Sequence, residues 1–302
     1  MPFPPFHENP PSEKSRLVFH FLSGLRSASM SKQGETGGGE ADMLEDYDKT
    51  GFTDQGVTKP LYVRGSGPAV IVMHEIPGIT PEVVRFADWV VDAGFRVYMP
   101  LLLGKAGKPL TMPYVATSMA SLCIRREFHI LASNSSSPVT GWLRALARHA
   151  HAEAGGEGVG AIGMCFSGNF ALSMMMEPAL MAPVLSQPSM PFPLGKTRKA
   201  ALHVSPAEWN CVKARCAKGD KVLGLRFKGD TLSPPEKFET LRRELGDGFE
   251  GIEIDDSHAN PASPAPHPHS VLTVDLIDRD GEPTREAAKR VIAFLRERLL
   301  AA

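Results

Sequence analysis

The sequence has no excess of charge of either sign and no long apolar run. Its 302 residues include 33 Lys and Arg against 34 Asp and Glu, a net charge of −1. That balance predicts no bulk attraction to nucleic acid or to an anionic membrane. No stretch approaches the roughly 18–20 apolar residues that a bilayer crossing requires. The apolar run 17–22 is short and contains a histidine, which makes it a poor signal-peptide core.

Cysteine is scarce, which limits the metal and redox chemistry that the chain can perform. The four cysteines, Cys123, Cys165, Cys211 and Cys216, form no CxxC pair and no His/Cys cluster. We therefore expect no metal site and no organic cofactor. Four thiols without a secretory signal are typical of a reducing compartment, so we expect a cytoplasmic protein. A cysteine is most often a small buried hydrophobe, and only Cys165 has neighbours that indicate chemistry.

The first part of the chain, residues 1–45, is rich in Pro, Ser and Gly and carries no core-forming pattern. Such a segment cannot bury enough apolar surface to offset its ordering entropy, so we expect a disordered tail. Two explanations stay open: an ordinary tail, or an over-extended start with Met30 or Met43 as the true initiator. Residues 46–302 contain no internal repeat and no proline-rich linker, which favours a single domain. We expect a monomer or a small homo-oligomer.

The folded part alternates apolar runs with helical patterns. Hydrophobic residues make up 42% of the chain and charged residues 22%, so a sizeable core can form. The predicted strands are 69–73, 96–100, 158–163, 182–186, 222–227 and 249–254. The predicted helices are 81–93, 115–131, 139–152, 167–177, 235–245 and 284–300. Continuous β-branched runs are typical of strands buried on both faces of a parallel sheet. The alternation therefore predicts an α/β protein, a three-layer sandwich with a mostly parallel central sheet.

The most informative motif is Gly163-Met164-Cys165-Phe166-Ser167-Gly168. It follows a predicted strand and opens a predicted helix, the context of a nucleophile elbow. Small residues on both sides of Cys165 let strand and helix approach closely. The thiol would then lie at the positive end of a helix, which favours an anion. The backbone N–H of Phe166 would face the same space and is a candidate oxyanion donor.

A second segment, His74-Glu75-Ile76-Pro77-Gly78, follows the first buried strand. In α/β-hydrolases this loop supplies the other oxyanion N–H, and Ile76 is the candidate donor. Glu75 is an ionisable group that could hold the thiol before substrate arrives. It could equally be a solvated loop carboxylate.

Together these two segments resemble the dienelactone hydrolase family. That family shows a Glu-Ile-x-Gly loop after an early strand and a Gly-x-Cys-x-Gly-Gly elbow, and the resemblance runs from about residue 60 to the C-terminus. It implies an α/β-hydrolase fold and a Cys-Asp-His triad that hydrolyses an activated ester or lactone through an acyl-enzyme. The family's acid follows a late strand, where this chain has Asp230. The chain order Cys165, Asp230, histidine matches that of α/β-hydrolases.

The histidine is ambiguous because three candidates follow the last predicted strand. His258 lies nearest the strand end, whereas His269-Ser270 resembles the family's His-Ser pair. His269 also lies at about the family's distance from the last helix. We favour His269, which makes 258–268 an inserted loop and His267 a solvated residue of it.

The chain departs from the family in the segment that would bind a substrate carboxylate. The family carries an arginine there, and Lys105 occupies about that position, a point charge rather than a bidentate fork. Arg125 and Arg126 could supply the fork or could lie on an exposed helix face. The segment Gln187-Pro188-Ser189 has no obvious counterpart, so the substrate can differ from a dienelactone.

The sequence thus predicts a cysteine hydrolase of small esters, lactones or thioesters. Two alternatives stay open. One is a catalytically idle hydrolase fold that serves as a binding module, because fold does not imply function. The other is a redox protein in which Cys165 pairs with another cysteine.

Overall fold

The computed structural model describes residues 42–128, 135 and 137–300, without the side chain of Arg126. The predicted tail therefore lies almost wholly outside the described residues, as does Met30. The first described element is a short 3-10 turn, η1 (Asp42–Leu44). Tyr47 follows it and is buried in the core.

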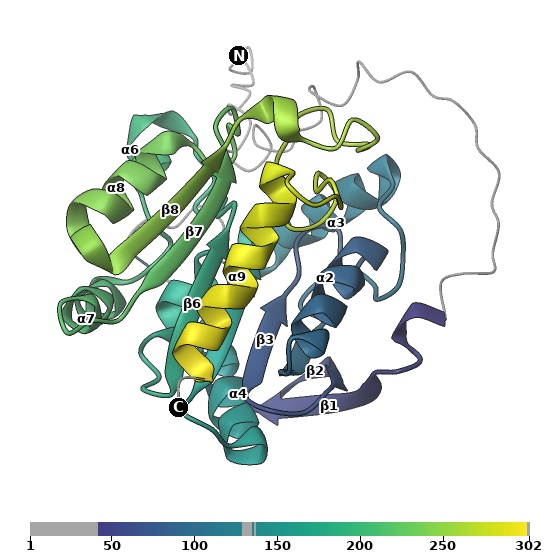
Figure 1. Cartoon of the computed structure of the whole chain (residues 1–302), viewed down its shortest axis with the longest axis vertical. Coiled ribbons are helices and arrows are strands. Elements are labelled where there is room, and N and C mark those ends of the chain that lie inside the picture. The colour runs from purple at the N-terminus through teal and green to yellow at the C-terminus, as the bar shows by residue number, and fades with distance from the viewer. Residues whose placement is uncertain (1–41, 129–134, 136, 301–302) are drawn as a thin grey trace, which may run out of the picture. The chain divides into compact units, whose positions relative to one another are not determined.

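A single eight-stranded sheet forms the centre of the described domain, with the strand order β1-β2-β4-β3-β5-β6-β7-β8 (Figure 1). The hairpin β1–β2 is antiparallel, β2 also pairs antiparallel with β4, and every other pairing is parallel. The strands are β1 (Asp48–Asp54), β2 (Val57–Arg64), β3 (Ala69–Met73), β4 (Arg96–Pro100), β5 (Val159–Met164), β6 (Leu180–Ser186), β7 (Val222–Phe227) and β8 (Phe249–Ile254).

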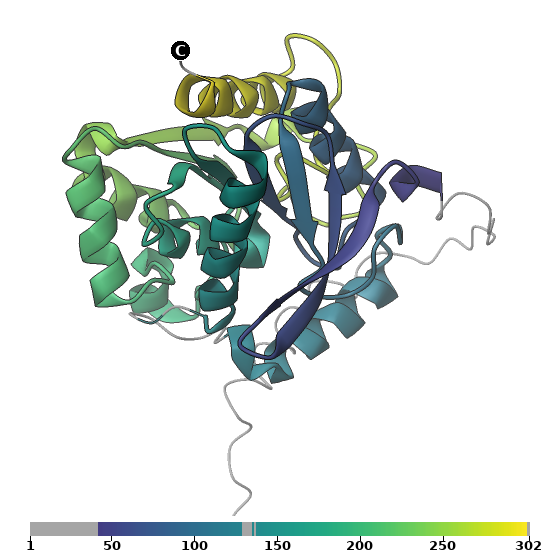
Figure 2. The same cartoon turned by 90° about the horizontal axis from the view of Figure 1, so that it is seen from below.

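Helices cover both faces of the sheet. They are α2 (Pro81–Asp92), α3 (Met112–Ile124), α4 (Val139–Ala154), α5 (Phe170–Met174), α6 (Gly195–Ala200), α7 (Pro206–Cys216), α8 (Pro235–Leu245) and α9 (Pro283–Leu299). Seen along the sheet, α2 and α9 lie on one side and α4 on the other (Figure 2). The apolar stripes of α2 and α9 share one core with β3, β5, β6 and β7. The prediction of a three-layer α/β fold is therefore confirmed.

The predicted central strands are confirmed because their continuous apolar runs are buried on both faces, as in β3 and β5. Two helices differ from the prediction. Helix α3 begins at Met112 and ends at Ile124 instead of covering 115–131. Helix α5 has five residues, preceded by the 3-10 turn η3 (Cys165–Ser167). The expected long helix behind the elbow was wrong, and so short a helix gives the thiol little dipole support.

The hairpin β1–β2 and the helices α6 and α7 were not predicted. Strand β1 is mostly exposed along its whole length, β2 is buried mainly in its second half, and neither strand carries a long apolar run. A sequence signal for α7 exists, because Ser205 and Glu208 form a reciprocal capping box at its start.

The strand register brings the ends of the parallel strands to one edge of the sheet. Met73 pairs with Gly163, Met164 pairs with Ser186, and Phe227 pairs with Ile254. The loops after β3, β5, β6, β7 and β8 consequently meet at the upper edge in Figure 1. Functional sites of open α/β sheets lie at this edge.

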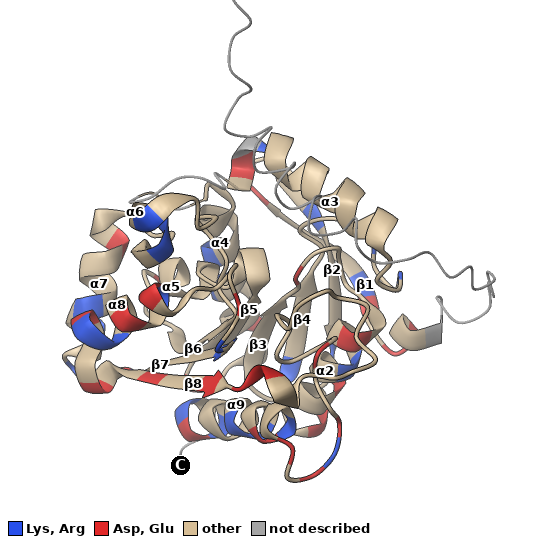
Figure 3. Cartoon of the chain, turned by 90° about the horizontal axis from the view of Figure 1, so that it is seen from above, with Lys and Arg blue, Asp and Glu red and all other residues tan. Residues whose placement is uncertain are grey.

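Acidic and basic residues are interspersed along α7, α8 and α9 rather than separated by sign (Figure 3). No helix among the described residues combines the length and apolar character that a membrane crossing requires.

Candidate active site

Cys165 lies on a sharp turn at the end of β5, with a positive φ of 54°. An L-residue with a side chain rarely adopts this conformation, so the turn is strained. Two glycines make the turn possible. A Cβ on Gly163 would lie 2.3 Å from the carbonyl oxygen of Ser167, and a Cβ on Gly168 would lie 2.6 Å from Pro188 Cα. The elbow geometry expected from the sequence is present.

The Cys165 thiol contacts Ser189, which the sequence analysis named only as part of a segment without a family counterpart. The Sγ atom lies 3.4 Å from the hydroxyl oxygen of Ser189, and Ser189 N donates to the carbonyl oxygen of Cys165 at 3.0 Å. Ser189 is fully buried and follows β6, the strand next to β5. The one sequence signal for it was its place just after a buried strand.

His269 and Asp230 form a close pair at the same edge. His269 Nδ1 lies 2.7 Å from Asp230 Oδ2. The other oxygen of Asp230 accepts from the backbone N–H groups of Leu232, at 2.9 Å, and Ser233, at 3.2 Å. The carboxylate is buried, so these three donors fix its orientation.

Burial opposes charging of the His269 ring, but the charges of Asp230 and Cys165 outweigh it and raise the pKa of His269 well above its ordinary value. This influence of Cys165 means that the imidazole and the thiol are neighbours. Within the described residues, however, Nε2 of His269 makes no hydrogen bond of ordinary geometry. Loose contacts of this kind are common in sites without substrate.

The backbone around His269 is held by Asp275, another residue that sequence reasoning missed. Its Oδ2 accepts from the N–H groups of His269 and Ser270, both at 2.8 Å. The two rival histidines lie elsewhere. His258 ends the 3-10 turn η5 (Asp256–His258) and lines a hollow with residues of α9, and His267 is exposed.

Glu75 is buried and lies at the meeting point of three loops. Its carboxylate accepts from Gln187 Nε2 at 3.1 Å, from Ser270 Oγ at 2.7 Å and from the Thr273 hydroxyl. Burial raises the pKa of Glu75, while these hydroxyl donors and His269 counteract the rise. Among the described residues, the hydrogen bonds of the Glu75 carboxylate go to these three side chains and not to Cys165. The expected contact with the thiol is therefore not present in this state.

The two candidate oxyanion residues follow the neighbouring strands β3 and β5. Ile76 follows β3 and is 8% exposed, whereas Phe166 follows β5 and is fully buried. The Phe166 ring packs edge-to-face on Phe128, with centroids 5.5 Å apart, and lies 5.8 Å from the ring of His74. These contacts anchor the elbow beside the loop that carries Ile76.

Lys105 lies against the Ile76 loop through its backbone. A Cβ on Gly78 would lie 2.5 Å from the Lys105 carbonyl oxygen, and Tyr114 donates its hydroxyl to that oxygen at 3.2 Å. The Lys105 side chain is exposed. Arg125 Nη1 lies 3.2 Å from both Leu102 O and Glu127 Oε1.

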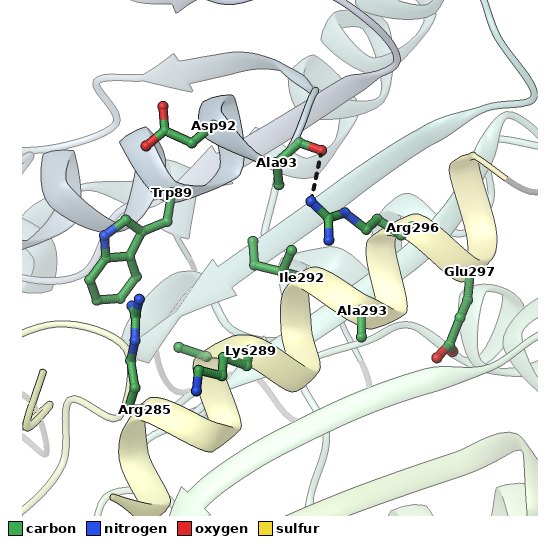
Figure 4. A pocket seen from close by; sticks show the side chains of 10 residues that line it. Trp89, Asp92, Ala93, Arg285, Lys289, Ile292, Ala293, Arg296 and Glu297 are labelled. Atoms are coloured by element: carbon green, nitrogen blue, oxygen red, sulfur yellow. Dashed lines mark hydrogen bonds between the residues drawn. The ribbon is translucent and has the colours of Figure 1, made fainter. Parts of the chain in front are cut away.

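A hollow elsewhere on the domain contains none of these residues. It lies between α2 and α9, and Figure 4 shows Trp89 facing the guanidinium of Arg285 across it. The Arg285 guanidinium carbon stands 3.8 Å from the centroid of the Trp89 ring. Among the described residues, no cluster of three or more His, Cys, Asp or Glu could hold a metal ion.

A mostly parallel sheet with a strained elbow after β5 and a carboxylate–imidazole pair at the same edge defines an α/β-hydrolase. A family model described as "Dienelactone hydrolase family" matches residues 57–201. Over these residues, a little under half of the chain, the sequence is similar to the dienelactone hydrolase family, and the chain is a dienelactone hydrolase-like hydrolase.

Solved structures agree with this fold. A dienelactone hydrolase from Anabaena variabilis is 14% identical with a TM-score of 0.54, covering 84% of this chain and 100% of that one. An esterase from Pyrococcus furiosus is 16% identical with a TM-score of 0.55, covering 88% and 98%. A dienelactone hydrolase-like promiscuous phosphotriesterase from metagenomic libraries is 16% identical with a TM-score of 0.53, covering 84% and 98%. A comparison with curated proteins gave no significant match.

Proposed function

We propose that the chain hydrolyses a small activated ester, lactone or thioester through an acyl-enzyme on Cys165. One observation carries the proposal: the His269 imidazole is hydrogen-bonded to the buried Asp230 and electrostatically coupled to the Cys165 thiol. A nucleophile, a base and a group that orients the base are the parts that covalent acyl transfer requires.

In the proposed reaction the Cys165 sulfur attacks the substrate carbonyl carbon and its proton passes to His269 Nε2. The carbon–sulfur bond forms, and the negative charge moves to the carbonyl oxygen, where the N–H groups of Ile76 and Phe166 stabilise it. The intermediate expels the alcohol or thiol, which takes the proton from His269. Water then attacks the acyl-enzyme carbonyl carbon and gives a proton to His269. The carbon–sulfur bond breaks, the acid leaves, and the proton returns from His269 to the Cys165 sulfur. Asp230 orients the imidazole throughout.

The charges around the site support the substrate class that we propose. Lys105 is the proposed contact for a substrate carboxylate, because its backbone lies against the Ile76 loop and its side chain is exposed. The guanidinium of Arg125 is already engaged by Glu127 and Leu102. A lysine on a flexible side chain holds a carboxylate less rigidly than the bidentate guanidinium of an arginine does. We therefore propose a substrate with a small acyl group, which can carry a carboxylate but does not need one.

The test is turnover of p-nitrophenyl acetate by the wild type, Cys165→Ala and Cys165→Ser. We expect both variants to lose most of the activity, and iodoacetamide to label Cys165 and abolish turnover in the wild type. Cys216→Ala is the matched control. Burial raises the pKa of the Cys216 thiol to about 11, with Asp220 adding to the rise, so this thiol stays protonated at neutral pH.

Full activity in Cys165→Ala would rule out the proposed mechanism. The absence of any turnover across esters, lactones and thioesters would favour an idle binding module. None of the four cysteines, all of which lie in the described part of the chain, forms a disulfide. A disulfide that joins Cys165 to another of them after mild oxidation would favour the redox protein.

A further inference from the structure

Two buried side chains that the proposed mechanism does not use hold the loop that carries Ile76. The first is His74, whose Nδ1 lies 2.7 Å from the carbonyl oxygen of Glu75. The second is Ser167, whose hydroxyl oxygen lies 3.0 Å from Met73 O and 3.1 Å from His74 O. Both side chains are fully buried.

The contacts of His74 identify its tautomer. Its Nε2 atom lies 3.0 Å from the backbone nitrogen of Leu102 and 3.3 Å from that of Leu103. Backbone N–H groups can only donate, so Nε2 accepts and carries no proton. The ring proton is therefore on Nδ1, which donates to the carbonyl oxygen of Glu75. Burial lowers the pKa of His74 to about 4, which keeps the ring neutral at neutral pH.

The hydrogen bond to Glu75 fixes the direction of the Ile76 N–H. The Glu75 carbonyl and the Ile76 N–H belong to one planar trans peptide group and point in opposite directions. A donor held on the carbonyl oxygen therefore sets where the N–H points.

Ser167 ties the same loop to the elbow. Its hydroxyl accepts from Met164 N at 2.9 Å. Its single proton is shared among the carbonyl oxygens of Met164, Met73 and His74, all within 3.1 Å. Ser167 directly follows Phe166 in the chain, so this contact links the residue that carries one N–H donor to the loop that carries the other.

We propose that His74 and Ser167 are positioning residues that set the direction and the spacing of the N–H groups of Ile76 and Phe166. The inference rests on the proposed function. Oxyanion donors act at about 2.7–3.1 Å from the developing negative charge, and a displacement of about 1 Å can cost roughly 10²-fold in rate. The loss falls on kcat because the charge exists only in the transition state.

Two His74 variants separate positioning from general structural support. His74→Asn keeps a donor near the Nδ1 position and loses the Nε2 acceptor. His74→Gln keeps an acceptor near the Nε2 position and loses the short-range donor to Glu75. We expect His74→Gln to lower kcat by about 10- to 100-fold with KM nearly unchanged, and His74→Asn to retain most of kcat. If His74 had only a structural role, kcat would fall by a similar factor in both variants.

Ser167→Ala tests the second positioning residue, with Ser173→Ala as the control. Ser173 is equally buried, and its hydroxyl has no hydrogen-bond partner among the described residues. We expect Ser167→Ala to lower kcat about 10-fold and Ser173→Ala to leave it unchanged. If thermal unfolding shows that neither His74 variant folds, the comparison of Ser167→Ala with Ser173→Ala tests the inference by itself.

The decisive second readout is the rate at which iodoacetamide alkylates Cys165. Alkylation requires the thiolate but forms no oxyanion, so this rate should stay at the wild-type value in His74→Gln and Ser167→Ala. A parallel fall in alkylation and turnover, or an unchanged kcat in both variants, overturns the inference alone. A wild type without Cys165-dependent turnover overturns the proposed function instead.

Discussion

The contacts of single residues distinguish the three histidines that follow β8. Within the described part of the chain, only His269 of the three has a carboxylate partner at hydrogen-bonding distance, Asp230 Oδ2 at 2.7 Å. His258 lies on a 3-10 turn and borders a hollow next to α9. His258 and His269, which are 11 positions apart in the sequence, therefore occupy quite different places in the fold.

We expect His269→Ala to lower kcat/KM by about 10²- to 10⁴-fold, the range that general base catalysis supplies. The variant leaves the thiol without the group that takes its proton. His258→Ala should change the rate by a few-fold at most. Turnover of p-nitrophenyl acetate by the two variants, measured side by side, checks this prediction. A large loss in His258→Ala with near-normal activity in His269→Ala would reverse the assignment.

At the scale of elements, the loop after β3 joins strands that are distant in sequence. His74, at its start, receives hydrogen bonds from the segment after β4, and Glu75 receives them from the loops after β6 and β8. Lys237 of α8 similarly holds the loop after β6, because its Nζ donates to three backbone carbonyls, those of Met190, Pro191 and Ala201.

Because the buried His74 ring is neutral, we expect the free energy of unfolding to depend on pH. Its pKa is about 4 in the folded chain and about 6.5 when unfolded. The unfolded chain therefore binds the extra proton first, and this contribution to stability is lost as the pH falls from about 6.5 to about 4. The maximum loss is roughly 3 kcal/mol, from about 1.4 kcal/mol per pKa unit. Urea unfolding between pH 4 and pH 7.5 measures it.

His74→Asn is the control, because all other titrating groups are the same in both proteins. The free energy of unfolding of this variant should fall less steeply with acid than that of the wild type. Parallel curves for the two proteins would show that His74 is not the group that titrates.

At the scale of the whole molecule, we propose that residues 46–302 fold as a single domain that does not need the segment before it. The sequence of residues 1–41 has no core-forming pattern, and the eight-stranded sheet with its helices on both faces lies within residues 42–300.

A chain that starts at Met43 should therefore keep the melting temperature and activity of the full chain, because truncations that remove no packed backbone are tolerated. Thermal unfolding and esterase assays on the two chains check this prediction. A fall of several degrees in melting temperature would mean that the removed segment packs on the domain.

The sequence by itself determined the α/β class, six of the eight strands and the elbow around Cys165. These features are local: strands depend on continuous apolar runs, and the elbow depends on small residues beside one position. Helix ends were less predictable. Nothing in the composition of 115–131 marks the end of α3 at Ile124, and the helix after the elbow is shortened to Phe170–Met174.

Only the tertiary structure decided which side chains meet around the thiol. Gln187, Ser189 and Thr273 come from loops after β6 and β8, yet they contact Cys165 or Glu75. Such contacts depend on the strand order and register, which place the ends of β3, β5 and β6 side by side. A hydrogen bond requires its two atoms to lie within about 3.5 Å. A local pattern sets the conformation of a turn, but the distance between turns far apart in the chain follows only from how the strands pair.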